Sequence, residues 1–182
     1  MSGKLARTFS NFLTSSSFIV TIVFTLLNSF LFLYSICLAI LLKYIRYKDS
    51  SKDTLPESIG KLESLETFYL KNNRLKNLPE SFGSLKNLKE TSIRNNQLKT
   101  IPVSIGNLKD LSFFSLANNN LEQLPATIGE MESLKSLWLD GNKLKELPSS
   151  IANLKSLRKI QLRGNPLESI PDALIKDSIT IV

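Results

Sequence analysis

Residues 101–123, IPVSIGNLKDLSFFSLANNNLEQ, form one complete unit of a sequence that repeats along most of this chain. Apolar residues recur at fixed offsets within every unit, as at Leu108, Leu111, Phe114 and Leu116 in this one. Each unit begins with a Leu-Pro or Ile-Pro pair, and the pairs follow one another at a constant spacing without insertion: Leu55-Pro56, Leu78-Pro79, Ile101-Pro102, Leu124-Pro125, Leu147-Pro148 and Ile170-Pro171. A fixed period of this kind predicts a solenoid, because one unit cannot bury its apolar residues alone and neighbouring units must stack.

Each part of the unit has a predicted structural role. The LxxLxL segment predicts a short strand of a parallel sheet, in which alternate side chains point to the core and to solvent. Proline stops sheet pairing on the opposite side, and the glycines that follow are expected to permit a tight bend; they are Gly60, Gly83, Gly106 and Gly129, with Ala152 in the fifth unit. An asparagine follows each strand, and its buried amide is expected to bond to backbone groups of adjacent turns. The predicted asparagine ladder comprises Asn73, Asn96, Asn119, Asn142 and Asn165.

The pattern LPxxIGxLxxLxxLxLxxNxL over residues 55–171 resembles the leucine-rich repeat family in its 23-residue type. Similar repeats occur in Ras-suppressor-like and Scribble-like scaffolds, in plant intracellular proteins and in bacterial proteins of this family. The resemblance implies an α/β-type repeat solenoid, a horseshoe with a parallel concave β-sheet and an irregular or 3-10 convex side. It also implies protein binding on the concave face, although the family is defined by its scaffold and not by one activity.

The repeats lose their regularity at both ends. Counting back by one period places Leu42, Ile45 and Tyr47 at core positions, which predicts a degenerate capping repeat over residues 43–54. Residues 55–182 are then expected to hold five full repeats and a C-terminal cap.

The C-terminal end has its own features. Gly164-Asn165-Pro166-Leu167 is similar to the final repeat of the family, and Asp177 stands where the full units have an apolar residue. Residues 179–182 are mostly apolar, which is unusual for an exposed edge. A partner strand or a truncated gene would each explain such an ending.

An uncharged apolar segment, residues 18–42, follows the more polar residues 1–17. As a helix it would be roughly 37 Å long at about 1.5 Å per residue, enough to cross a bilayer core of about 30 Å. It is longer and lies later than a usual signal peptide and has no good cleavage site, so we expect an uncleaved signal anchor, with cleavage as the alternative. The basic residues that follow it favour a cytoplasmic location for the repeats, and the alternative is a secreted or cell-surface location.

Composition removes several classes of function. The chain has no histidine and one cysteine, Cys37, so no Ser-His-Asp or Cys-His arrangement and no Cys/His zinc site can be assembled. Phosphate-binding glycine motifs are missing too. The net charge of +7 comes from mixed Lys, Arg, Asp and Glu, without the one-sided stripe of a nucleic-acid-binding face. We therefore expect no catalysis, no cofactor, no metal and no nucleic-acid partner.

The candidate binding residues lie at the solvent-side positions of the predicted strands. Phe113 and Trp138 are large aromatic residues where the scaffold needs none, and their diagonal offset on adjacent strands predicts that they meet. Small neighbours are expected to leave this aromatic patch open, and the alternative is that the rings merely cover each other. The predicted partner-binding residues are Tyr69, Lys71, Ser92, Arg94, Phe113, Ser115, Trp138, Asp140, Gln161 and Arg163.

The sequence thus predicts a membrane-anchored interaction module that binds a protein or peptide on its concave face. Two alternatives stay open: a secreted or cell-surface protein with a cleaved signal that binds extracellular ligands, and a structural remnant or fragment of a larger repeat protein.

Overall fold

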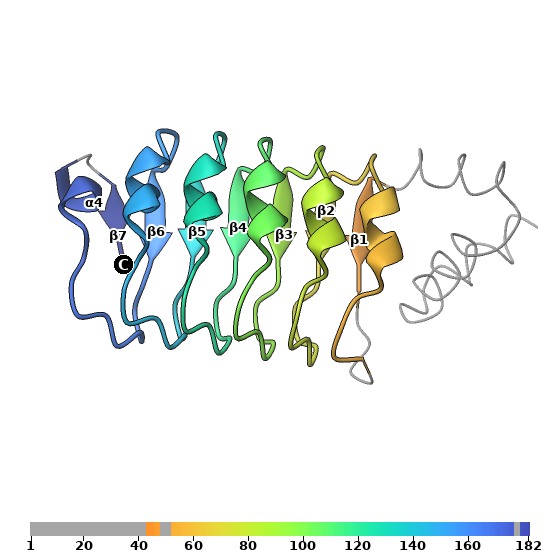
Figure 1. Cartoon of the computed structure of the whole chain (residues 1–182), viewed down its shortest axis with the longest axis horizontal. Helices are drawn as coiled ribbons and strands as arrows, with labels where there is room; N and C mark the ends of the chain where they lie inside the picture. The colour runs from red at the N-terminus through yellow and green to blue at the C-terminus, as the bar shows by residue number, and fades with distance from the viewer. Residues whose placement is uncertain (1–42, 48–51, 177–178) are drawn as a thin grey trace, which may run out of the picture.

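Seven short strands form one parallel sheet in chain order, with a layer of short helices beside it (Figure 1). The computed structural model describes residues 43–47, 52–176 and 179–182. The strands are β1 (Tyr44–Arg46), β2 (Thr67–Tyr69), β3 (Glu90–Ser92), β4 (Phe113–Ser115), β5 (Ser136–Trp138), β6 (Lys159–Gln161) and β7 (Thr180–Ile181). The helices are the 3-10 helices η1 (Glu57–Lys61), η2 (Glu80–Ser84), η3 (Val103–Asn107), η4 (Ala126–Glu130) and η5 (Ser149–Asn153), and the α-helix α4 (Asp172–Lys176). The solenoid with a parallel sheet and a 3-10 side is therefore as predicted.

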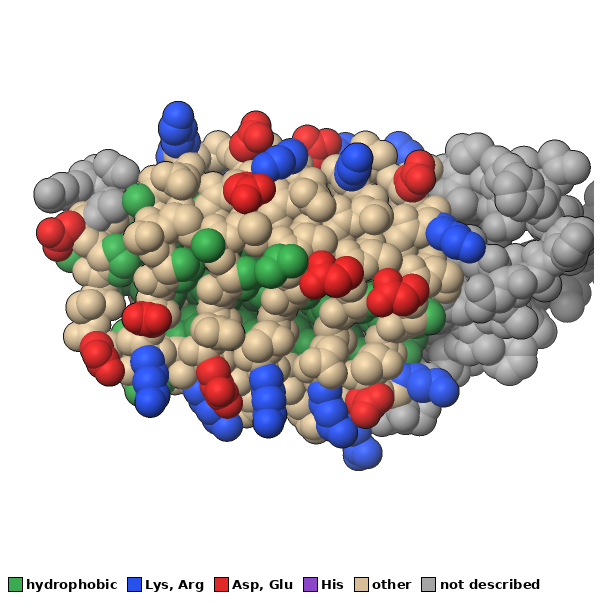
Figure 2. Space-filling model, viewed as in Figure 1, with side chains coloured by type: hydrophobic (Ala, Val, Ile, Leu, Met, Phe, Trp, Pro, Cys, Tyr) green, Lys and Arg blue, Asp and Glu red, His purple; other side chains and the backbone are tan. Residues whose placement is uncertain are grey.

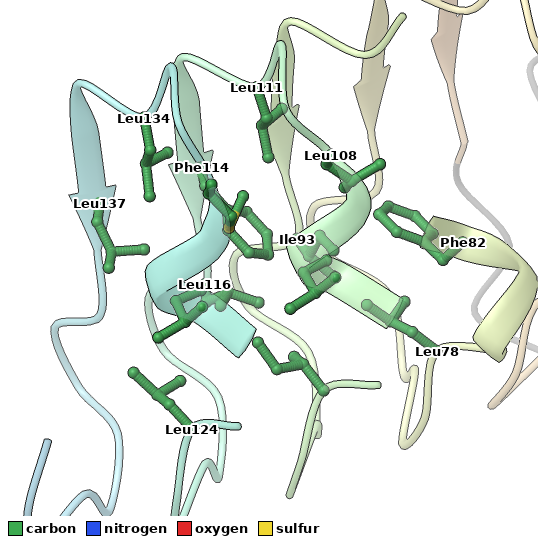
Figure 3. Close-up of a cluster of buried hydrophobic side chains, with 14 of the residues drawn as sticks. Leu78, Phe82, Ile93, Leu108, Leu111, Phe114, Leu116, Leu124, Leu134 and Leu137 are labelled. Carbon is green, nitrogen blue, oxygen red and sulfur yellow. The ribbon is translucent and has the colours of Figure 1, made fainter. Parts of the chain in front are cut away.

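Strands β1 to β6 pair in the register that the repeat period dictates, whereas β7 departs from it, since Thr180 lies opposite Lys159. Phe68 lies opposite Thr91, Thr91 opposite Phe114, and Phe114 opposite Leu137, so equivalent residues form columns that run across the sheet. This core column is buried throughout, and its one hydroxyl, that of Thr91, donates to the carbonyl oxygen of Phe68 at 2.8 Å. Figure 3 shows Phe114 and its neighbours directed into the interior between the strands and the 3-10 helices. Core packing between repeats thus supplies the stability that no single repeat could.

The glycine column has a different role from the one predicted. Within the described residues, positive φ angles among glycines occur at Gly141 and Gly164 and not in this column. Each column glycine instead lies against the next 3-10 helix: a Cβ at Gly60 would lie 2.6 Å from the carbonyl oxygen of Ser81, far inside van der Waals contact. Glycine is therefore required by close helix packing and not by a tight bend. The fifth repeat has Ala152 at this position, and there the next helix is α4.

The asparagine ladder is confirmed as structural. Asn96 is 8% exposed, and its Nδ2 donates to the carbonyl oxygens of Ile93 at 2.8 Å and Leu70 at 2.9 Å, while its Oδ1 accepts from the N–H of Leu75 at 3.0 Å. Asn119 and Asn142 repeat this set of bonds one and two periods later. Each amide thus joins its own turn to the preceding one and satisfies backbone groups that the sheet leaves free.

The two ends of the sheet add strands beyond the five full repeats. Ile45 of β1 lies opposite Phe68 and is 7% exposed, as the counted-back register predicts; Leu42 lies outside the described residues. At the other end β7 pairs with β6, and the Val182 carbonyl accepts the N–H of Leu162 at 2.7 Å. The apolar residues at this end therefore form the edge strand of the sheet, where Val182 is 52% exposed. Asp177 lies outside the described residues.

A cluster of three charges joins the first strands. Glu66 accepts from Lys43 Nζ at 2.7 Å and from Lys89 Nζ at 2.8 Å. The hydrogen bonds and positive charge of these lysines lower the pKa of the Glu66 carboxyl to about 2, and the carboxylate in turn raises the pKa of Lys89.

In the part of the chain that the structure describes, no helix is long and apolar enough to span a bilayer. The predicted membrane segment, residues 18–42, lies outside that part.

Candidate functional site

The solvent side of the sheet presents the columns that the repeat register defines. The central column comprises Tyr69, Ser92, Ser115, Trp138 and Gln161, which are paired strand by strand. The preceding column, two residues earlier, comprises Thr67, Glu90, Phe113, Ser136 and Lys159, and the following column, two residues later, comprises Lys71, Arg94, Ala117, Asp140 and Arg163. All predicted partner-binding residues therefore lie on one face.

Phe113 and Trp138 form the aromatic pair that the sequence predicts. Their ring centroids are 5.0 Å apart and the rings are inclined by 81°, an edge-to-face arrangement favoured by the ring quadrupoles. Both side chains are half-buried. Lys159 adds a cation 6.0 Å from the Trp138 ring centroid. The pair is thus an ordered apolar surface with solvent on one side.

A second aromatic pair lies at the other end of the face. Tyr44 and Tyr69 meet edge to face at 5.7 Å, and Tyr44 is 55% exposed. Lys71 Nζ lies 5.1 Å from the Tyr69 ring centroid, and the Tyr69 hydroxyl donates to Glu90 Oε2 at 3.1 Å. Burial and the nearby Glu90 carboxylate raise the pKa of Tyr69. Sequence reasoning missed Tyr44, although counting back one period from Thr67 would have placed it on this face.

A hollow of about 350 Å³ lies between the two aromatic pairs. It is lined by Tyr69, Lys71, Asn72, Ser92, Arg94, Asn95, Phe113, Ser115 and Trp138. The structure therefore brings most of the predicted binding residues to one place. Asp140, Gln161 and Arg163 lie further along the face and do not line this hollow.

The serines of the central column differ from expectation. They were expected to be open to solvent, but Ser92 is 7% and Ser115 is 1% exposed, and Ala117 is 1% exposed. The reason is the size of their neighbours: larger side chains rise around them, so Ser92 and Ser115 form the bottom of the hollow. Their small volume is what makes the hollow possible.

A second asparagine column borders the hollow and was missed by sequence reasoning. Asn72, Asn95 and Asn118 have φ angles of 61°, 57° and 52°, a left-handed conformation that asparagine tolerates better than most residues. Asn95 Nδ2 donates to Asn72 Oδ1 at 2.6 Å, and Asn118 Nδ2 donates to Asn95 Oδ1 at 2.9 Å. The signal was present in the sequence, because the position before each ladder asparagine is Asn in three repeats and Gly, at Gly141 and Gly164, in the next two.

The charges of the hollow are basic and lack carboxylate partners. Among the described residues, neither Lys71 nor Arg94 forms an ion pair; Arg94 Nε instead donates to Asn95 Oδ1 at 3.4 Å. Ion pairs occur elsewhere, at Glu66 and at Lys109, which contacts Glu130 and Glu132. Figure 2 shows the 3-10 face, where acidic and basic side chains are interspersed along the rims. The two cations of the hollow thus have neither an ion-pair partner nor a carboxylate among the residues that line it.

The described residues hold no group of three or more acidic, histidine or cysteine side chains that could bind a metal ion. What the arrangement offers is a shaped, basic and partly aromatic surface.

Two models of known protein families match this chain. A family model described as a leucine-rich repeat region matches residues 83–176, and a single leucine-rich repeat model matches residues 64–85. The chain belongs to the leucine-rich repeat family. Proteins of this family are typically interaction modules without catalytic activity, and the resemblance stated from the sequence is confirmed at the level of the family.

Two solved structures are similar to this leucine-rich repeat protein. One is a leucine-rich repeat protein of Leptospira interrogans, 33% identical, with a TM-score of 0.72 over 76% of this chain. The other is the ectodomain of the plant membrane receptor kinase GASSHO1/SCHENGEN3 from Arabidopsis thaliana in complex with CASPARIAN STRIP INTEGRITY FACTOR 2, 35% identical, with a TM-score of 0.61 over 70% of this chain. This chain spans 36% of the first protein and 16% of the second. A search of curated proteins gave no match.

Proposed function

We propose that this chain is a membrane-anchored interaction module whose concave face binds a protein or peptide. The observation that carries the proposal is the Phe113–Trp138 pair at the edge of the hollow. Both are aromatic residues at solvent-side positions where the scaffold does not require an aromatic side chain. Aromatic side chains beside a depression are a usual source of binding energy in protein interfaces.

Two polar atoms at the aromatic pair have no partner in the described part of the chain. Ser115 Oγ and Trp138 Nε1 are buried and have no hydrogen-bond partner among the described residues.

The membrane part of the proposal rests on residues 18–42 of the sequence and the basic residues after them. We propose that this segment anchors the chain and that the repeats lie on the cytoplasmic side. The second candidate is an exported protein with a cleaved signal, which Lys4 and Arg7 before the apolar segment favour. The proposal includes no catalytic step.

Fractionation separates the two candidates. Full-length chain in the detergent-extracted membrane fraction supports the anchor, and a soluble product without the apolar segment contradicts it and supports export.

Binding is tested by affinity capture with the full chain and with the Phe113→Ala/Trp138→Ala variant. The matched control is Val103→Ala/Ile175→Ala, which removes two apolar side chains that are each 62% exposed and lie outside the sheet. We expect specific partners to be lost from the first variant and kept by the control. Equal capture by all three proteins would contradict a role of the concave face.

A further inference from the structure

The composition of the hollow indicates what kind of segment it accepts. Its two cations, Lys71 and Arg94, lie on one side, and the Phe113–Trp138 pair lies on the other. No carboxylate is among the residues that line it. We propose that the hollow binds an extended acidic peptide segment of a partner protein, with an Asp or Glu side chain between Lys71 and Arg94 and an apolar side chain against the aromatic pair. This inference rests on the proposed function of the concave face.

The argument for a carboxylate is charge complementarity. Lys71 and Arg94 lie in one hollow, no carboxylate lines it, and neither has an acidic partner within 4 Å among the described residues. Lys71 lies near the Tyr69 ring, and Arg94 contacts a neutral amide. An acidic group from a partner would supply the missing charge, and the planar guanidinium of Arg94 can hold a carboxylate with two parallel hydrogen bonds.

The argument for a neighbouring apolar side chain is the size and wall of the hollow. A volume of about 350 Å³ is near the lower end for ligand pockets, so it accepts side chains and not a folded surface. The Phe113–Trp138 pair gives one wall an apolar surface, while the polar bottom is formed by Ser92 and Ser115. Among partner side chains, an aliphatic or aromatic one would bury the most apolar surface against the Phe113–Trp138 pair.

The strand spacing fixes the distance between the two side chains. Arg94 lies two strands from Trp138, about 10 Å across the sheet, and two residues further along its strand, about 7 Å, so the two positions are about 12 Å apart. An extended peptide advances about 3.3 Å per residue and its alternate side chains share a face, so the acidic and the apolar side chains are expected about four residues apart. The exposed amides of Asn72 and Asn95 border this path and can bond to the peptide backbone.

The test uses the full chain in detergent and a random-peptide display library as the probe. Peptides that the chain enriches are synthesised with a fluorescent label, and their binding is followed by fluorescence anisotropy, which can also be measured for the variant that lacks Trp138, the only tryptophan of the protein. We expect an Asp or Glu about four residues from an aliphatic or aromatic residue. Replacement of the acid by its amide, or Lys71→Ala/Arg94→Ala in the protein, should weaken binding about tenfold, the loss expected for two accessible charge pairs. The matched control, Lys143→Ala/Lys145→Ala, removes the same charge outside the hollow and should leave binding unchanged.

The outcomes separate this inference from the proposed function. Peptides that require Phe113 and Trp138 but show no acidic preference and bind the Lys71→Ala/Arg94→Ala variant equally well overturn the acidic-peptide inference and leave the concave interface standing. Enriched peptides that bind the Phe113→Ala/Trp138→Ala variant as tightly as the wild type overturn both, and so does a library that yields no peptide dependent on the hollow. An equal loss of affinity in the Lys71→Ala/Arg94→Ala variant and in the Lys143→Ala/Lys145→Ala control overturns the inference, because general charge attraction then explains the binding.

Discussion

Replacing Asn119 by alanine measures what the asparagine ladder contributes to stability. The side chain is 6% exposed and bonds on both sides of its turn. Its Oδ1 accepts the N–H of Leu98 at 3.0 Å, and its Nδ2 donates to the carbonyl oxygens of Leu116 at 2.9 Å and Ile93 at 3.1 Å. The variant loses all of these bonds, but it does not leave every partner unsatisfied.

The ladder is redundant on its acceptor side. The Leu116 carbonyl also accepts from Asn142 Nδ2 at 3.0 Å, and the Ile93 carbonyl also accepts from Asn96 Nδ2 at 2.8 Å. The N–H of Leu98 has no second partner among the described residues. One orphaned buried donor costs about 1–3 kcal/mol, and two lost but replaceable bonds about 0.5–1.5 kcal/mol each. The free energy of unfolding should therefore fall by about 2–6 kcal/mol.

The assay is denaturant unfolding followed by far-UV circular dichroism and Trp138 fluorescence. The control is Asn120→Ala in the next position, whose backbone N–H bond to the Leu98 carbonyl survives the change. We expect the control to stay within about 0.5 kcal/mol of the wild type, as surface substitutions usually do. A loss below about 1 kcal/mol for Asn119→Ala, or one equal to that of the control, would refute the assignment of the ladder as structural support.

Other substitutions test the remaining features. Gly83→Ala would drive a Cβ into the carbonyl oxygen of the next 3-10 helix and should cost about 1–3 kcal/mol in the same unfolding assay; no loss would contradict the packing role of the glycine column. Phe113→Ala/Trp138→Ala should cost less than about 2 kcal/mol, since the half-buried rings lose mainly their mutual contact, against about 3–5 kcal/mol for the buried Phe114→Ala; similar losses in both would place the pair in the core. The pKa of Glu66 is about 2 in the folded chain against 4.5 ordinarily, so its contribution is complete above pH 4.5 and is lost as the pH falls from 4.5 toward 2. Glu66→Gln should remove that part of the pH dependence of thermal unfolding, and an unchanged acid profile would show that the ion cluster contributes nothing.

The sequence predicts the fold well because the repeat period constrains register directly. Once Leu111, Phe114 and Leu116 are aligned with their equivalents, the pairing of β1 to β6 follows, and so does the contact of Phe113 with Trp138. The pairing of β7 does not follow, because Thr180 lies opposite Lys159, outside the repeat period. Ile45 is placed in the same way, although its repeat is degenerate. Periodicity is informative here because stacked repeats must put equivalent residues in equivalent environments.

What the sequence could not predict depends on contacts between columns. The glycine role was wrong because the nearest atoms to Gly60 belong to Ser81 in the next repeat, which a reading within one repeat does not include. The burial of Ser115 was missed because it follows from the size of its neighbours and not from its own character. The membrane segment and its orientation stay predictions, since residues 18–42 lie outside the described part of the chain.

The distribution of charge along the repeats bears on the proposed binding role of the hollow. A basic side chain on a stacked repeat can find an acid one period away, as Lys89 does with Glu66 and Lys76 with Asp53. The residue one period after Lys71 is Arg94, which is also basic. The following column therefore places two like charges on adjacent repeats. Neighbouring like charges on adjacent strands cost free energy in the unliganded protein. A bound carboxylate would turn this repulsion between cations into attraction for the ligand. The comparison of each acidic peptide with its amide counterpart is therefore the most direct test of what this face binds.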